Sequence, residues 1–172
     1  GQKYVARCVR LHFFLDELDE GILRGHLSRP RSEVEADLNE RYLGFLVVKP
    51  IPHTFVGRTC LRTYDPDGGR RFYPPTRKCD ASLLGLALQV ESLAYQEQDT
   101  VAAACATSAL WSVLHATALL FQHKVYTPVE ITRSATEKFP TFGRIFPNAG
   151  LTPAQIAAAI RGVGLEPEVL AV

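Results

Sequence analysis

Apolar residues near the start of the chain recur at the spacing of an α-helix that buries one face. The residues that carry this pattern are Leu11, Phe14, Leu15, Leu18 and Ile22. They predict a helix over residues 10–27. A second helix is predicted over 32–42, where Ser32 and Glu35 stand at the spacing of a capping box.

The middle of the chain changes to patterns that are typical of β-strands. Residues 42–49 form a β-like run, and residues 54–64 are rich in Thr, Val and aromatic side chains. A strong turn signal at 65–69, with the sequence DPDGG, precedes a short predicted strand over 70–73. Apolar residues then alternate along one face of the segment 84–90, at Leu84, Leu86, Leu88 and Val90. Together these segments predict a small, largely antiparallel sheet.

The longest predicted helix covers residues 101–122. Between residues 105 and 122 its only titratable groups are Cys105 and His115. Because apolar residues occupy most of its circumference, we expect this helix to be buried nearly all round. The exceptions lie on one stripe at helical spacing, formed by Ser108, Ser112 and His115.

Two further helices share the same start signal, with Thr at the N-cap, Pro at N1 and Glu or Gln at N3. The signal occurs in 127–131 and again in 152–156. The apolar faces of these helices are Ile131, Ala135 and Phe139 in the first, and Ile156, Ile160 and Val163 in the second. Residues 165–172 then look like the beginning of a strand.

The order of these elements predicts an α+β chain. We expect residues 104–121 to form its central helix, contacted by 128–138 and by 153–162. Helices and a small antiparallel sheet are expected to precede this helix.

Charge and composition exclude several classes of function. The formal net charge is +1, which gives no electrostatic reason to expect a nucleic-acid partner. No apolar run approaches the ~20 residues needed to cross a bilayer, so no membrane partner is expected. The cysteines form no CxxC pair and have no histidine at metal-ligand spacing, so we expect no metal and no other cofactor. Reduced thiols in a cytoplasmic protein fit this pattern.

The segment 96–111, with the sequence QEQDTVAAACATSALW, places glutamines a short loop before a cysteine that enters an apolar helix. It resembles the papain-like cysteine peptidases, in particular bacterial C39-like peptidases similar to bacteriocin-processing enzymes. The segments 150–156 and 164–169 look like the second helix and the following strand of that family. The resemblance covers roughly residues 95–172 and implies that they are the N-terminal half of a papain-like catalytic domain. Residues 1–94 would then be a separate N-terminal helical and antiparallel β region.

This resemblance implies thiol-dependent hydrolysis of peptide or amide bonds in a peptide or protein substrate, or transfer of the acyl group to an amine. Cys105 would be the nucleophile and Gln98 the oxyanion-hole donor. The family's Gln commonly stands about six residues before the Cys, whereas Gln98 stands seven before and Gln96, the other candidate, nine before. The Gly that often follows the family's Cys is replaced here by Ala106.

The family's histidine base follows the cysteine by many tens of residues and is itself followed by Asp or Asn. The resemblance therefore implies that the base lies beyond Val172, in the remaining C-terminal part of the domain or in another chain. It also implies that these residues alone are inactive. His115 follows Cys105 by ten residues on the same predicted helix, about 15 Å of rise away, so it cannot touch the thiol.

Two other classes of function stay open. The chain is alternatively a catalytically inactive papain-like module that binds peptides or has a regulatory role, or a structural domain whose Ala-rich helices only form a core. Three of the thiols, those of Cys8, Cys60 and Cys79, are expected to be structural. The N-terminal histidines, His12, His26 and His53, are expected at the surface.

Overall fold

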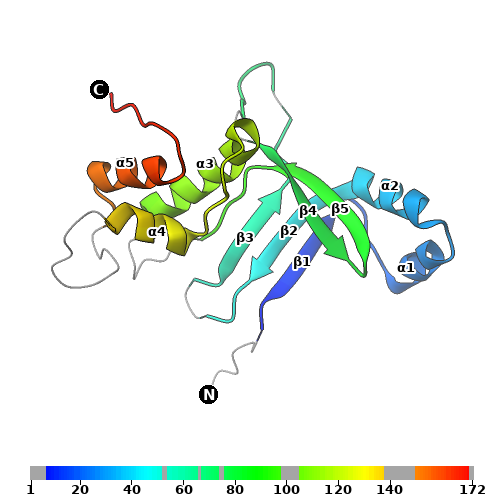
Figure 1. Cartoon of the computed structure of the whole chain (residues 1–172). Coiled ribbons are helices and arrows are strands. Elements are labelled where there is room, and N and C mark those ends of the chain that lie inside the picture. Colours follow the sequence, from blue (N-terminus) through cyan, green and yellow to red (C-terminus); the bar gives the residue numbers. More distant parts are fainter. Residues whose placement is uncertain are drawn as a thin grey trace. The chain divides into compact units, whose positions relative to one another are not determined.

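The computed structural model describes residues 7–51, 54–65, 67–73, 76–97, 105–137 and 150–170 (Figure 1). The chain mixes helices with two small antiparallel sheets, which is an α+β arrangement. It divides into two compact units, Gly1–Gln96 and Glu97–Val172. In the described parts of the chain, no helix is long and apolar enough to cross a membrane.

The first unit contains both sheets and two helices. Its elements are β1 (Val9–Phe14), α1 (Glu20–Leu27), α2 (Arg31–Arg41), β2 (Tyr42–Val48), β3 (Val56–Leu61), β4 (Arg77–Leu83) and β5 (Leu86–Ser92). Antiparallel pairing gives one sheet the order β1-β2-β3 and joins β4 to β5 in a second sheet. The register of the first sheet places His12, Phe45 and Cys60 side by side on one face.

The outer edge of β3 is paired by the segment that follows β5. Thr59 donates its N–H to the carbonyl of Tyr95 at 2.7 Å, and Tyr95 donates to the carbonyl of Thr59 at 2.9 Å. These two bonds connect the end of the second sheet to the first, so the two sheets share one core. Its most deeply buried side chains include Leu38, Tyr42, Phe45, Cys60, Cys79 and Leu88.

The predicted helix over 10–27 is wrong in its first part, where the chain forms β1, and only Glu20–Leu27 is helical. Val9, Leu11 and Phe13 also alternate, so this apolar segment fits a period of two as well as a period of 3.6. Pairing with β2 along the whole strand decides between the two periods. The same pairing leaves His12 half-buried rather than at the surface, with its Nδ1 atom 2.9 Å from the Tyr42 hydroxyl.

The strands β2 and β3 confirm the β-like runs 42–49 and 54–64. The predicted strand over 70–73 is wrong, because these residues belong to an irregular loop. The strand β4 was not predicted: its sequence, RKCDASL, mixes charged and small residues and has little apolar character. Leu84 lies in the β4–β5 turn with a φ of 51° and is exposed, whereas Leu88 and Val90 of β5 are buried as predicted.

The helix α2 confirms the predicted helix over 32–42, but not its capping box. Its N-cap is Pro30, and no side chain caps it. Glu35 instead joins a row of α2 side chains, spaced four residues apart, that bond the outer backbone edge of β5. The bonds are Arg31 Nη2 to Gly85 O (2.8 Å), Ala87 N to Glu35 Oε1 (2.8 Å), Asn39 Nδ2 to Ala87 O (3.0 Å) and Gln89 N to Asn39 Oδ1 (2.7 Å). On the same helix, Val34 and Leu38 are buried.

In the second unit, α3 (Cys105–Phe121), α4 (Pro128–Thr136) and α5 (Pro153–Gly162) follow one another. The main contacts join α3 to α4 and α4 to α5, so α4 rather than α3 is the middle helix of this unit. Both predicted capping boxes are confirmed. Thr127 accepts from the N–H of Glu130 and Thr152 from that of Gln155, each at 3.3 Å.

The apolar faces of these helices are only partly as predicted. In α4, Ile131 and Ala135 are fully buried, while Phe139 lies outside the described residues. In α5, the buried residues are Ala157 and Ala159. Small residues mark this contact because the helices approach closely: a methyl group at Gly162 would overlap the Ser134 hydroxyl. Residues 165–170 form no strand, which contradicts the prediction for that segment, and Val169 and Leu170 are exposed.

The expectation that α3 is buried nearly all round is also wrong. Its buried residues lie on one side and include Ser108, Trp111 and His115, whose ring stacks on that of Trp111 at 5.2 Å. The predicted polar stripe therefore lies partly on the buried side of the helix. Large apolar residues are exposed elsewhere on it, at Val113, Leu119, Leu120 and Phe121.

Replacing Asn39 with Ala removes two bonds to the β5 edge and should destabilise the chain by roughly 1–2 kcal/mol. Urea unfolding followed by circular dichroism measures this loss. Glu40→Ala, a change at the adjacent exposed position, is the matched control and should have little effect. Equal stability of both variants would contradict the role given to Asn39.

Acid should weaken the capping of α4. The pKa of Glu130 is lowered from its ordinary 4.5 to about 2. The largest cause is Lys124, whose Nζ atom lies 2.6 Å from the Glu130 carboxylate, followed by hydrogen bonds from the N–H and the hydroxyl of Thr127. Since the pKa is lowered on folding, ionised Glu130 stabilises the fold fully above about pH 4.5, and this contribution is lost as pH falls through about 2.

The variant Glu130→Gln keeps a capping residue of the kind that Gln155 provides but loses the ion pair. The difference in melting temperature between the parent chain and this variant should therefore shrink as the pH is lowered across that window. Glu137→Gln, at the other end of α4, is the control for a general loss of negative charge. A difference that does not change with pH would contradict the assignment.

Candidate functional site

The structure places the thiol of Cys105 at the surface of the second unit. Cys105 is exposed, and α3 is described from this residue onward. Gln98 lies outside the described residues, as do 99–104, and Gln96 is half-buried in the first unit. The structure therefore describes the nucleophile candidate and one of the two glutamine candidates, which belong to different units.

The histidines described in the second unit already contact other groups of α3 or of the residues that follow it. His115 is buried and stacked on Trp111. His123 lies with Nε2 2.9 Å from the Thr117 hydroxyl and Nδ1 2.9 Å from the carbonyl of Lys124. Cys105 is therefore an exposed thiol at one end of a helix that contains no charged residue. A substrate can reach such a thiol, but a base must come from residues other than these histidines.

A second group of thiols lies in the core of the first unit. Cys60 on β3 and Cys79 on β4 are 0% and 2% exposed. The Cys79 thiol donates a hydrogen bond to the carbonyl of Arg77, with Sγ 3.7 Å from the oxygen. Arg58 and Cys60 are two residues apart on β3 and so share a face of that strand. We name the group of Arg58, Cys60 and Cys79 the thiol cluster.

The thiol cluster divides ionisation unequally between its two sulfurs. The hydrogen bond with Cys79 and then burial raise the pKa of Cys60. The hydrogen bond with Cys60 lowers the pKa of Cys79, and Arg58 and Arg77 lower it further against the opposing effect of burial. Of the two thiols, Cys79 therefore ionises more readily than Cys60.

Sequence reasoning treated both buried cysteines as inert. The available signal was a repeated spacing, Arg-x-Cys, which occurs as Arg58-Thr59-Cys60 and as Arg77-Lys78-Cys79. On a strand, this spacing puts a cation and a thiol on the same face. The spacing alone cannot reveal that both thiols are buried in one core, because β3 and β4 belong to different sheets.

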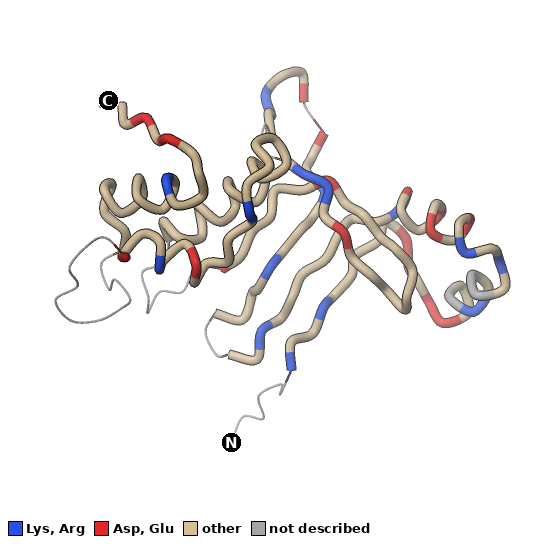
Figure 2. The backbone as a smooth tube through the Cα atoms, in the orientation of Figure 1, with Lys and Arg blue, Asp and Glu red and all other residues tan. Residues whose placement is uncertain are grey.

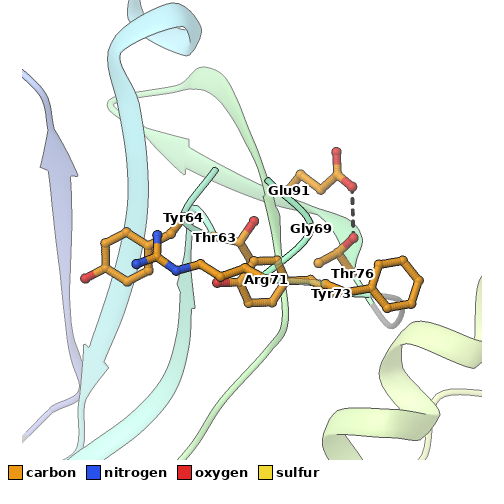
Figure 3. Close-up of a pocket in the computed structure, with 8 residues that line it drawn as sticks. Thr63, Tyr64, Gly69, Arg71, Tyr73, Thr76 and Glu91 are labelled. Carbon is orange, nitrogen blue, oxygen red and sulfur yellow. Dashed lines mark hydrogen bonds between the residues drawn. The ribbon is translucent and has the colours of Figure 1, made fainter. Parts of the chain in front are cut away.

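A hollow of about 480 Å³ lies in the loop between β3 and β4, beside β5 (Figure 3). The Arg71 guanidinium group lies over the ring of Tyr64, with its Cζ atom 5.1 Å from the ring centroid. On the other side, the Thr76 hydroxyl donates to Glu91 at 2.9 Å. The lining residues are Thr63, Tyr64, Gly69, Arg71, Phe72, Tyr73, Thr76 and Glu91. Aromatic faces with one cation and one carboxylate could hold an extended peptide or a small aromatic molecule.

Comparison with known proteins gives no relative from which a role could be carried over. The chain matches no protein-family model, no curated protein and no solved structure. The assignment of a function therefore depends on the residues themselves.

Burial predicts the order in which the thiols react. Under native conditions, iodoacetamide should alkylate the exposed thiols of Cys105 and Cys8. The buried thiols of Cys60 and Cys79 should react at least about 100-fold more slowly. Peptide mass spectrometry after timed quenching measures each rate, and a sample in urea provides the unprotected rates. Protection of Cys105 equal to that of Cys60 would contradict its exposed position.

Proposed function

We propose that Cys105 is the nucleophile of a papain-like cysteine peptidase, a thiol-dependent hydrolase of peptide or amide bonds. Residues 95–172 would form the N-terminal half of its catalytic domain. The observation that carries the proposal is the exposure of Cys105 at the start of α3, whereas Cys60 and Cys79 are fully buried and Cys8, which is also exposed, precedes the strand β1. A thiol that serves only as core packing has no reason to lie at the surface.

The arrangement of the second unit supports this proposal. The helix α3, which begins at the cysteine and carries no charged residue, packs against α4. A capping box fixes the start of α4. A nucleophile held on a packed helix keeps its position as a substrate binds. In addition, the sequence before Cys105 offers two glutamine amides, at Gln96 and Gln98, as candidate oxyanion donors.

The reaction follows from the chemistry of the thiol. The thiolate attacks the substrate carbonyl carbon, and the carbonyl oxygen becomes an oxyanion that N–H donors stabilise. The C–N bond then breaks as the leaving amine takes a proton from an acid, and a thioester with the enzyme remains. Water hydrolyses this thioester in the second half of the reaction. Since the described histidines of the second unit are engaged elsewhere, we propose that the base lies beyond Val172, as in the family that the sequence resembles.

The test is turnover of a peptide substrate library by the natural protein that carries this chain. Cys105→Ala should abolish turnover and leave the circular dichroism spectrum intact, because Ala is small and favours helix. Cys8→Ala changes the other exposed thiol and should leave turnover unchanged. Activity that persists in Cys105→Ala would rule out the proposed nucleophile.

Two further variants separate the oxyanion candidates. Gln98→Ala should slow turnover by roughly 100- to 1,000-fold, the effect of losing one oxyanion donor, while Gln96→Ala should have a much smaller effect. The reverse order would assign the donor to Gln96. Peptide binding without turnover, unaffected by Cys105→Ala, would instead favour the inactive peptide-binding module.

A further inference from the structure

We propose that two copies of this chain associate through their β1 strands, which pair antiparallel about a two-fold axis and join the β1-β2-β3 sheets of both copies into one continuous sheet. The interface lies in the first unit and shares no residue with the proposed peptidase site. The inference is therefore independent of Cys105.

The outer edge of β1 differs from the other strand edges of the first unit. The edge of β3 is paired by Tyr95, and that of β5 is bonded by side chains of α2. The edge of β4 carries the exposed charges of Lys78 and Asp80, which protect a strand against association. In contrast, β1 ends its sheet with the sequence VRLHFF, which is apolar apart from Arg10 and His12 (Figure 1). An apolar edge strand of this kind is a site of association.

The hydrogen bonds of the sheet show which backbone groups of β1 point outward. Arg62 donates its N–H to the carbonyl of Leu43 at 2.7 Å, so Leu43 bonds β3 and the next residue of β2 bonds β1. That next residue lies opposite Phe13, whose backbone therefore bonds β2. Because the direction alternates along a strand, the backbone groups of Arg10 and His12 point away from β2. Among the described residues, no backbone group pairs with these outward groups.

One register of the two β1 strands suits these outward groups. With His12 of both copies at the two-fold axis, Arg10 lies opposite Phe14 of the second copy, and symmetry supplies the reciprocal pair. The outward N–H and C=O groups of each strand then bond the other strand. Arg10 is the only Lys, Arg, Asp or Glu of β1 (Figure 2). An axis at Arg10 would place two guanidinium groups directly opposite each other, which is unfavourable.

The same register matches apolar side chains on one face of the joined sheet. Val9, Leu11 and Phe13 alternate along β1 and so share a face, where they are 41%, 45% and 39% exposed. With the axis at His12, Leu11 lies opposite Phe13 of the second copy. Cross-strand pairs of aromatic and aliphatic side chains stabilise a sheet. The exposed row of one copy is therefore covered by the same row of the other.

Charges at the two ends of β1 support the same register. Arg7 precedes the strand and Glu17 follows it, and both are exposed. Counting outward from His12 at the axis places Arg7 of each copy opposite Glu17 of the other. An axis at Leu11 would instead place Arg7 opposite Leu15. Opposite charges at both rims favour the register centred on His12.

Sedimentation velocity of the whole chain over a range of concentrations tests the association. One pair of short strands makes a small interface, so we expect a reversible dimer with a dissociation constant of roughly 1–100 µM. Leu11→Lys puts a cation into the apolar row and should weaken dimerisation at least about tenfold. Leu61→Lys is the matched control. Leu61 is 41% exposed on the same face of the sheet but lies on β3, so this change should leave dimerisation unaltered.

A second pair of variants separates backbone pairing from side-chain contact. Arg10→Pro removes an outward N–H without removing a bond to β2, and it should abolish dimerisation. Arg10→Met loses the charge but keeps the N–H, and it should dimerise nearly as well as the parent chain. Circular dichroism melting shows whether each variant is folded.

Disulfide crosslinking tests the register. Chains with Cys8→Ser and Cys105→Ser carry in addition either Leu11→Cys or Phe13→Cys, and the two kinds of chain are mixed and mildly oxidised. The proposed register makes these positions a directly opposed, non-hydrogen-bonded pair, whose Cα atoms are about 4.5 Å apart and so within reach of a disulfide. The mixed disulfide should form faster than a disulfide between identical chains.

Several results would overturn the proposal. A chain that stays monomeric well above the expected concentration range contradicts it, and so do equal effects of Leu11→Lys and Leu61→Lys. A preference for the disulfide between two Leu11→Cys chains would overturn the register. If Arg10→Pro does not fold, the decision rests on Leu11→Lys and on the crosslinking, which leave the backbone of β1 intact.

Discussion

The first unit is organised by the need to pair the backbone at the edges of two very small sheets. An unpaired strand edge exposes N–H and C=O groups that attract other chains. At β5, three side chains of α2 supply alternating donors and acceptors and so take the place of a neighbouring strand. At β3, the Thr59–Tyr95 pair has the same role with backbone groups. Because both solutions tie sequence-distant segments together, they also bring β3 and β4 into one core, where Cys60 and Cys79 are both buried.

The second unit depends on local signals instead. Its helices α4 and α5 begin where Thr-Pro-x-Glu and Thr-Pro-x-Gln direct them, and their contact is set by the small pair Ser134 and Gly162. Local encoding makes helix positions independent of distant pairing. Within α3, the buried ring of His115 stacks on that of Trp111, four residues before it.

That contrast explains how far sequence reasoning reached. The capped helices α4 and α5 and the strands β2 and β3 followed from local patterns. The start of the chain failed because its apolar residues satisfy two periods, and only pairing with β2 selects the strand. The predicted capping box at Glu35 was wrong for the same kind of reason. Its spacing from Ser32 fits a capping box, but the β5 edge offers its carboxylate a backbone N–H. The exposure of Cys105 and the burial of Cys60 and Cys79 depend on tertiary contacts that no window of sequence contains.

A cysteine thiol is therefore accessible to different reactants in the two units. A thiol at the surface, like that of Cys105, can meet a large substrate, and its reactivity depends on what base and donors approach it. A thiol in the core, like that of Cys79, is shielded from large substrates, and the fold fixes its neighbours. The position of a thiol in the fold thus decides which reactants can reach it.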